Sequence, residues 1–552
     1  MAYRINQKQL TMRIIKLSIL FLAMGLNAFA QDKSDWKGGV PEGCTTITVG
    51  KDASFDGSVM TSHTDDSHRT RSWMQMVAAK DWPKGSMAPM FLREQDNAKA
   101  MPIYKHTKIG EIPQVAHTYA YLNTAYPSMN EHQLAIGEST FGGLDTMQSD
   151  SGIIDCQRLV QLMLERTTTA REAILMADDL LQQYGWNDAG EALTIADTKE
   201  VWHFEIVGPG KGKKGAVWVA QRVPDNHVAV NANASTIGEI NLKNKDYFMA
   251  SKNIYSVAEE MGLWSKKSGK AFSFKYVYAP SSRMSVAARR REWRVLSLVA
   301  PSLNLNPNAQ DYPFSVKPEG KITVAIMISL FKDYYEGTPY DMCRTITVAD
   351  KDGKQVISPL ANPFMPYDQL EVNKVNGGWF HVNKETNHIQ FLGERTIARW
   401  YTMYGTITQS RAWLPDAIGG KVWLAQDNIA SSIYIPVYCG ATHLPKSYAT
   451  PGRENGFTHE SAWWAFNRLG TLTAQRWGDM RHDVDAVWNP MQQQMFDEEK
   501  DFEAKAQELS KAEDAKKLID YLTEYTNKWG NTVVDRAWKL GDELWTKYDE
   551  KF

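Results

Sequence analysis

Cys44 is the residue whose type and position offer the most chemistry in this chain. It follows a short polar, glycine-rich segment, residues 31–43, and opens the alternating stretch Cys-Thr-Thr-Ile-Thr-Val-Gly. If the chain is cut between Gly43 and Cys44, a thiol and a free α-amine belong to one residue. Their ordinary pKa values, about 8.5 and about 7.7 to 8.0, allow proton exchange near neutral pH. Cys44 would then supply both nucleophile and base; the alternative is a buried strand cysteine.

The N-terminal residues have the pattern of a segment that is removed. Four basic residues precede the apolar run 17–26, and Ala-Phe-Ala, ending at residue 30, is the small-x-small pattern that a signal peptidase reads. We expect residues 1–30 to be a signal peptide, with Met12 as a possible start, and residues 31–43 to be a propeptide. The run is too short to span a bilayer. The sequence therefore predicts an exported protein, periplasmic or secreted, with no membrane anchor.

A second group of reactive side chains is His63-Thr-Asp65-Asp66-Ser-His68. These residues could ligate zinc or manganese, but alternate residues of a strand face opposite sides, so His63 and Asp66 should point apart. The sequence also contains no HExxH helix motif. We therefore expect no metal and no cofactor. Inhibition by a chelator, and not by a thiol alkylator, would favour the metal hydrolase.

Composition narrows the function classes. The 552 residues include 62 Lys and Arg against 64 Asp and Glu, so the chain has no basic surplus for binding nucleic acid. The expected partners are small peptides, with a homo-oligomer as an open possibility. With 19 Trp and 23 Tyr, a non-catalytic exported protein with an aromatic peptide groove is one alternative function. Whether the other three cysteines form disulfides is left open.

Strands precede helices and more strands follow, which favours an α+β fold of layered sheets over a parallel βαβ sheet. We expect a catalytic domain over residues 44–459 and a helical region over residues 460–552, with a capping box at Ser510 and a helix end at Gly530. The other expected elements are strands at 44–50, 58–63, 200–207, 216–223, 227–231 and 431–438, and helices at 155–166 and from a capping box at Thr169 to Gly185.

Several motifs, in order along the chain, resemble the cysteine dipeptidases of the dipeptidase A family. They are N-terminal nucleophile (Ntn) hydrolases, related to secernins and, more distantly, to bile salt hydrolases and penicillin V acylases. The resemblance implies a four-layer αββα sandwich in which Cys44 attacks an amide carbonyl. The matching motifs are Cys44 to Gly50, Asp56-Gly-Ser, Asp65-Asp66, Asn130 to Thr140, Val223 to Asn233, Arg290 to Pro301 and Ile435-Pro-Val-Tyr.

The resemblance also implies roles for individual residues. Asp66 matches the aspartate that holds the α-amine in the related acylases, and Arg291 matches their late active-site arginine. Asn233 matches one of the two asparagines of the acylases that donate to the oxyanion. If the alignment were shifted by two residues, Asn231 would match instead. His63 stands where those acylases have an arginine beside the thiol, and this departure puts thiolate stabilisation there in doubt.

Other positions are expected to contact the substrate. The acylases' earlier asparagine falls near Ser139 and Thr140, so that donor is changed or shifted, and Thr140 remains a candidate substrate contact. Asp65 and Glu138 are the nearest carboxylates for reading a dipeptide's free ammonium. A linear amidase acting on acyl amino acids or bile-acid conjugates is the alternative within the same fold.

Overall fold

The computed structural model describes residues 43–67, 70–96, 103–363, 380–383, 388–391, 394–512 and 514–550. The predicted signal peptide, the predicted propeptide up to residue 42, and His68 lie outside the described residues. Gly43 and Cys44 lie inside them.

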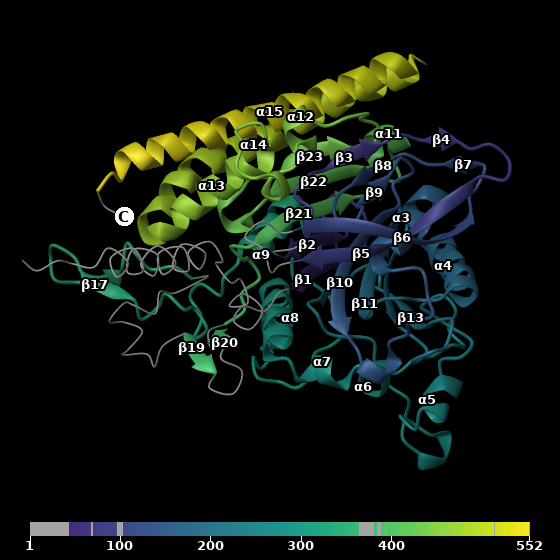
Figure 1. The fold of residues 1–552 in the computed structure, drawn as a ribbon. Helices are drawn as coiled ribbons and strands as arrows, with labels where there is room; N and C mark the ends of the chain where they lie inside the picture. Colours follow the sequence, from purple (N-terminus) through teal and green to yellow (C-terminus); the bar gives the residue numbers. More distant parts are fainter. Residues whose placement is uncertain are drawn as a thin grey trace, which may run out of the picture.

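The strand that begins at the predicted cleavage point lies inside an antiparallel sheet (Figure 1). Gly43 and Cys44 pair with Asp66 and Asp65 of the next strand. On its other side the strand pairs with residues 228–231, and Thr46 lies opposite Asn231. In the described part of the chain this sheet has the order β16 (Ser315–Val316), β14 (Val228–Asn231), β1 (Gly43–Val49), β2 (Ser62–Asp66), β21 (Thr402–Gln409), β22 (Lys421–Gln426) and β23 (Ile435–Tyr438).

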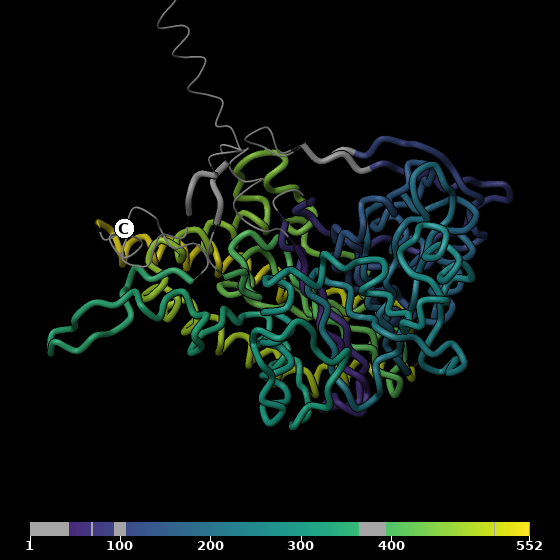
Figure 2. Tube along the Cα trace, turned by 90° about the horizontal axis from the view of Figure 1, so that it is seen from below, coloured from purple at the N-terminus to yellow at the C-terminus, as the bar shows by residue number. Residues whose placement is uncertain are grey.

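A second antiparallel sheet faces the first, with β10 against β1 and β2. In Figure 2 the purple N-terminal segment runs between blue segments on one side and green segments on the other. In the described residues its order is β15 (Phe248–Ala250), β13 (Val217–Arg222), β12 (Val201–Val207), β11 (Gly190–Ala196), β10 (Ala135–Gly142), β9 (Met129–Asn130), β8 (Tyr121–Asn123) and β3 (Gln75–Val77).

Helices contact both sheets. The α4 helix packs on β11 and β12, and α3 contacts β9. The α8 helix packs on β14, and the C-terminal helices pack on β22 and β23, where Figure 1 draws them in yellow above the sheet. Buried apolar side chains of both sheets and of these helices form one continuous core. The bounds are α3 (Cys156–Arg166), α4 (Ala170–Tyr184), α8 (Val286–Val299), α13 (Ala462–Gln475), α14 (Trp477–Lys511) and α15 (Ala515–Lys547).

The remaining helices are short, and the remaining strands form separate pairs, of which β5 with β6 is the longest. They are the helices α5 (Ser256–Glu260), α6 (Phe274–Tyr278), α7 (Pro280–Met284), α9 (Val324–Lys332), α11 (Asp416–Gly419) and α12 (Lys446–Ala449), and the paired strands β4 (Lys80–Asp81) with β7 (His117–Thr118), β5 (Met87–Asp96) with β6 (Ile103–Pro113), β17 (Thr347–Ala349) with β18 (Gln355–Ile357), and β19 (Phe380–Asn383) with β20 (His388–Phe391).

Local signals in the sequence position several of these elements correctly. Thr169 and Glu172 form the expected capping box at the start of α4, and Gly185 ends it with a positive φ of 81°. The glycine-rich segment 208–215 joins β12 to β13 as a hairpin. The β2 strand begins at Ser62, later than expected. The mixed, antiparallel α+β architecture is therefore as predicted.

The structure contradicts two predictions in the C-terminal region. Ser510 lies inside α14, and the cap of α15 is Asp514, whose side chain accepts from the Lys517 N–H. Gly530 does not end a helix, since α15 continues through it. A Cβ at position 530 would lie 2.7 Å from Pro445 Cγ, so this glycine allows the helix to approach a neighbouring segment closely.

All four cysteines are free thiols, which answers the pairing question that the sequence left open. Among the described residues, no helix is both long and apolar enough to cross a membrane.

Candidate active site

Antiparallel pairing places the reactive residues around the first residues of β1. Because β1 and β2 run in opposite directions, the end of β2 lies beside the start of β1. The end of β14 lies on the other side and continues to Asn233. The β10 strand faces this point from the second sheet. Residues far apart in the sequence therefore meet at Cys44.

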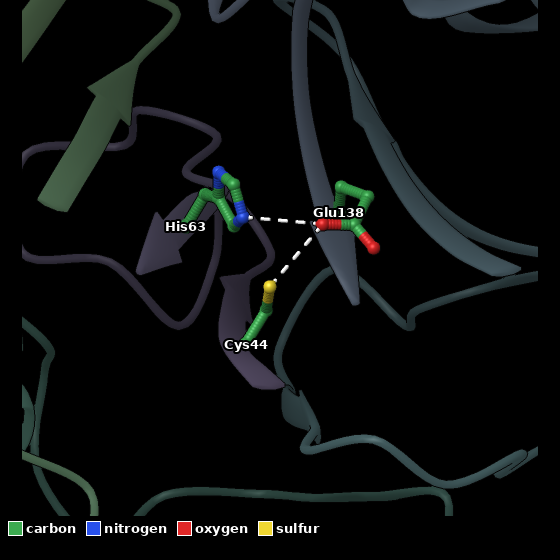
Figure 3. A group of neighbouring side chains, drawn as sticks. All are labelled: Cys44, His63 and Glu138. Carbon is green, nitrogen blue, oxygen red and sulfur yellow. Dashed lines mark hydrogen bonds and ion pairs between the residues drawn. The ribbon is translucent and has the colours of Figure 1, made fainter. Parts of the chain in front are cut away.

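The Cys44 thiol points toward a carboxylate and an imidazole (Figure 3). Its Sγ donates to Glu138 Oε2 at 3.3 Å, and the same oxygen lies 3.3 Å from His63 Nε2. On the far side of the ring, His63 Nδ1 lies 3.2 Å from the Tyr404 hydroxyl. All of these side chains are buried, so their interactions are little screened by water.

The surroundings of the thiol are negatively charged. Burial raises the pKa of Cys44 well above its usual value, and Glu138, Asp65 and Asp66 raise it further. In the intact chain the thiolate is therefore disfavoured. An added positive charge close to Sγ would favour it.

Glu138 is one half of a carboxylate pair. The Thr140 hydroxyl lies 2.9 Å from an oxygen of Glu138 and 2.9 Å from an oxygen of Glu191. Burial and Glu138 raise the pKa of Glu191 well above its usual value. Burial also opposes the charge of Glu138, but hydrogen bonds from His63 and Glu191 outweigh it and lower the pKa of Glu138. The charged form is therefore favoured at Glu138 and disfavoured at Glu191.

The Cys44 backbone nitrogen is held separately from its thiol. It donates to Asn233 Oδ1 at 3.0 Å, and an Arg291 nitrogen donates to the same oxygen at 2.8 Å. Asn233 Nδ2 donates to the Thr140 carbonyl at 2.7 Å. A flipped amide would turn its NH₂ toward two donors, so the hydrogen-bond network fixes this orientation. Asn233 takes the left-handed conformation, with φ 60°.

Arg291 fixes the backbone around Cys44. Its guanidinium donates to the Cys44 carbonyl at 2.7 Å, to the Thr45 hydroxyl at 2.9 Å and to the Ala232 carbonyl at 3.0 Å. Burial and the nearby charge of Arg395 lower the pKa of Arg291 to about 9. Arg291 therefore acts as a rigid clamp between β1 and the segment after β14.

Arg395 is a functional candidate that the sequence did not reveal. It bonds to Asp66 and donates to the Gly43 carbonyl at 3.2 Å, while the Thr402 hydroxyl donates to Asp66 at 2.6 Å. Burial opposes the charge of Arg395, but the attraction of Asp66 outweighs it and raises the pKa. Arg395 lies more than 320 residues beyond Asp66, in a segment without a recognisable motif; only its contacts reveal it.

Gly43 occupies a position that other residues would not fit. Its φ is 154°, and a Cβ there would lie 2.1 Å from Asn233 Oδ1. Both the conformation and the crowding require glycine directly before Cys44.

A cavity of about 490 Å³ opens at this point, lined by Gly43, Cys44, Asp65, Asp66, Ser67, Thr70, Tyr126, Thr140, Phe141, Gly142, Asn233, Ser281, Ser282 and Ser285. Asp65 reaches it directly and accepts from the Thr70 hydroxyl at 2.5 Å. Burial raises the pKa of Asp65 to about 7, although His63 and the Thr70 hydroxyl favour its charged form.

A family model, Peptidase family C69, matches residues 43–490. This chain belongs to peptidase family C69. The match begins at Gly43, the first residue of β1.

Individual relatives agree over most of their length. A probable dipeptidase B of Lactococcus lactis subsp. lactis (strain IL1403) is 25% identical over 411 residues, which cover 73% of this chain and 76% of that protein. A probable dipeptidase of Salmonella dublin is 24% identical over 437 residues, 75% of this chain and 83% of that protein. Dipeptidase A of Lactobacillus helveticus is 22% identical over 522 residues, 92% of this chain and 98% of that protein.

The structure of this C69 peptidase gathers the predicted site residues Cys44, His63, Asp65, Asp66, Glu138, Thr140, Asn233 and Arg291 around one point. Asn231 is set apart, because its amide donates to the Ala234 carbonyl. In the intact chain Asp66 bonds to Arg395, and the Asn233 NH₂ bonds to the Thr140 carbonyl. The amine-holding role of Asp66 and the oxyanion role of Asn233 stay predictions.

Proposed function

We propose that this chain is the exported precursor of a cysteine dipeptidase, and that removal of residues 1–43 makes Cys44 an N-terminal nucleophile. The observation that carries the proposal is the separate holding of the Cys44 nitrogen and thiol at the wall of one cavity. Membership of family C69 and the dipeptidase names of its relatives support the substrate class. Facing sheets with helices on both are compatible with the four-layer Ntn sandwich.

In the proposed turnover, the free α-amine of Cys44 accepts the thiol proton and Sγ attacks the peptide carbonyl. Asn233 Oδ1 already accepts from this nitrogen, which supports its role in orienting the amine. The resulting ammonium protonates the leaving amine, and the acyl group remains on sulfur. Water, activated by the regenerated amine, then releases the acid.

Cleavage of the Gly43–Cys44 bond is proposed to be a reaction of the chain itself. Sγ attacks the Gly43 carbonyl, the C–N bond breaks, and the Cys44 nitrogen takes up a proton to become the α-amine. Water hydrolyses the resulting thioester and restores the thiol. The Arg395 bond to the Gly43 carbonyl oxygen supports a role for this cation at the developing oxyanion.

The substrate ammonium is proposed to bind Asp65. Asp65 and Glu138 are both candidates from the sequence and both are buried, but Asp65 lines the cavity and Glu138 is not among its lining residues. A carboxylate at the cavity wall attracts the ammonium of an unblocked dipeptide. An N-acylated dipeptide has no ammonium and cannot form this ion pair.

Intact mass and a substrate panel test the proposal together. The purified active protein should begin at Cys44 and should hydrolyse unblocked dipeptides faster than N-acylated ones. An active protein that retains Gly43 would contradict the nucleophile assignment. Preference for acyl amino acids or bile-acid conjugates would replace the dipeptidase by a linear amidase.

Gly43→Ala tests self-cleavage, with Glu42→Ala as the matched control in the same segment. The added methyl group cannot fit beside Asn233 in the observed geometry, so Gly43→Ala should accumulate as uncleaved precursor. Glu42→Ala should be processed like the wild type. Normal processing of Gly43→Ala would contradict the proposed arrangement.

A further inference from the structure

The side chains of Cys44, His63 and Glu138 offer three donors of the kind that zinc prefers: sulfur, imidazole nitrogen and carboxylate oxygen. Their ligand atoms all lie within 4.8 Å of one another. Figure 3 shows the three side chains converging from β1, β2 and β10. This is not the group that the sequence suggested, since Asp66 bonds to Arg395 and His68 lies outside the described residues.

The spacing fits a tetrahedral ion. With Zn–S of about 2.3 Å and Zn–N and Zn–O near 2.0 to 2.2 Å, tetrahedral angles place S and O about 3.5 Å apart and N and O about 3.4 Å apart. The observed distances are 3.3 Å from Cys44 Sγ to Glu138 Oε2 and 3.3 Å from Glu138 Oε2 to His63 Nε2. Both distances to the Glu138 oxygen are therefore close to those of a tetrahedral zinc site, and Sγ and Nε2 lie within 4.8 Å of each other.

The second layer of contacts suits the same role. The Tyr404 hydroxyl lies at His63 Nδ1, which orients the ring with Nε2 toward the other two donors. Outer hydrogen bonds of this kind hold metal-binding histidines in place. Glu138 is held on its other oxygen by the Thr140 hydroxyl.

The local charge also favours a dication. Glu138, Asp65 and Asp66 surround the thiol, and only Asp66 is directly paired with an arginine, Arg395. Arg291 is directed at backbone carbonyls and at Asn233. Cys44 lines the cavity, so an ion could reach the donors from the solvent side and keep a water there as fourth ligand.

We propose that Cys44, His63 and Glu138 form a reversible Zn²⁺ site, and that an ion bound there inhibits the enzyme by occupying its nucleophile. Binding replaces the thiol proton, which passes to solvent, and forms bonds from Zn²⁺ to Sγ, Nε2 and the carboxylate. The binding site depends on the observed geometry alone; the inhibition depends on the proposed function as well.

Cobalt substitution tests the site without reference to activity. One equivalent of Co²⁺, added to the purified protein, should give the near-ultraviolet absorption of a cobalt thiolate, and Zn²⁺ should displace it. Cys44→Ala should abolish the band. If Cys156→Ala abolishes it and Cys44→Ala does not, the ion occupies the neighbouring group of Glu138, Cys156 and Glu191, and the proposal is overturned.

Variants of the other two ligands complete the test. His63→Gln and Glu138→Gln should each weaken Zn²⁺ affinity by more than the roughly 10-fold that loss of an outer contact costs. His132→Gln is the matched control, because His132 is paired with Asp416 away from Cys44 and should leave the affinity unchanged. Equal affinities in all three variants would overturn the proposal.

The activity measurement separates this inference from the proposed function. Wild-type hydrolysis should fall as Zn²⁺ is added and return after chelation. A protein that binds the ion at Cys44 but hydrolyses no dipeptide contradicts the proposed function and leaves the metal site intact. Undiminished hydrolysis at saturating Zn²⁺ overturns the inhibitory role.

Discussion

Two buried charged clusters lie on the same seven-stranded sheet. The first surrounds the start of β1, where Glu138, Asp65 and Asp66 all act on the thiol and Arg395 pairs directly with Asp66 alone. The second joins the far strands of the sheet to α14. There Arg411 makes two bonds of 2.8 Å to Glu503, and Lys421 lies 2.6 Å from Glu499 and 3.2 Å from Glu503.

The difference between the clusters lies in charge balance. At α14 two cations, Lys421 and Arg411, meet two carboxylates. Burial alone would raise the pKa of Glu503, but the two cations outweigh this effect and lower it. At Cys44 the charged forms of Glu191 and of the thiol are both disfavoured, since the pKa of each is raised well above its usual value. A balanced buried cluster fixes the helix against the sheet. An unbalanced one leaves groups ready to exchange protons or bind cations.

Cys44→Ala should give the largest effect that this comparison predicts. Without the nucleophile, hydrolysis should fall by about 10⁴-fold or more, and the chain should keep Gly43. Cys343→Ala, which removes a buried thiol far from the cavity in sequence and contacts, should retain wild-type activity per folded molecule. Dipeptide turnover and intact mass measure both. Near-normal activity of Cys44→Ala would contradict the assignment of Cys44 as the nucleophile and of the first cluster as the active site.

Glu503→Gln should affect stability and leave the chemistry unchanged. It leaves two buried cations partly unpaired, and breaking such a pair costs about 3 to 5 kcal/mol in the free energy of unfolding. Because the pKa of Glu503 is lowered on folding, its stabilisation is present above the unfolded pKa and is lost as pH falls. Denaturant unfolding near neutral and at acidic pH measures both effects. A large loss of kcat/KM at unchanged stability would contradict the structural role.

The Asp65 carboxyl should make substrate binding at the first cluster depend on pH. Its pKa of about 7 means that it becomes charged as pH rises through neutrality, so KM for unblocked dipeptides should fall over that range. The free energy of unfolding changes in the opposite direction. Because folding raises the pKa of Asp65, its contribution to stability is full at pH values below the unfolded-state pKa and is lost as pH rises through about 7.

Asp65→Asn should remove the pH dependence of KM for unblocked dipeptides and leave N-acylated substrates unaffected. Equal changes in KM for both substrate classes would show that Asp65 does not read the ammonium.

A pair of glycines in α15 gives the smallest predicted effect. Gly530→Ala would place a methyl group 2.7 Å from Pro445 Cγ, and the strain should exceed the helix-propensity gain, for a net loss of about 1 kcal/mol. Gly541→Ala would meet the end of the flexible Arg468 side chain at 2.6 Å, which can move, so it should be neutral or stabilising. Thermal unfolding compares the two; equal shifts would contradict the close-packing interpretation of Gly530.

Local sequence reasoning succeeded where the cause of a structure is local. The strand at Cys44, the capping box at Thr169 and the end of α4 at Gly185 depend on residues within one or two turns. It was wrong at Ser510, because Asp514 caps α15 instead, and at Gly530, where the close approach of Pro445 accounts for a glycine inside the helix.

The sequence by itself determined the candidate nucleophile, the glycine before it and the family motifs, since these depend on residue type and order. Only the tertiary structure decided the partners of these residues: Arg395 on Asp66, Glu191 beside Glu138, and His63 near the thiol. The physical reason is that charge, burial and hydrogen bonding depend on distance in space. The fold brings together groups that lie up to 352 residues apart in the chain, as Arg395 and Gly43 do.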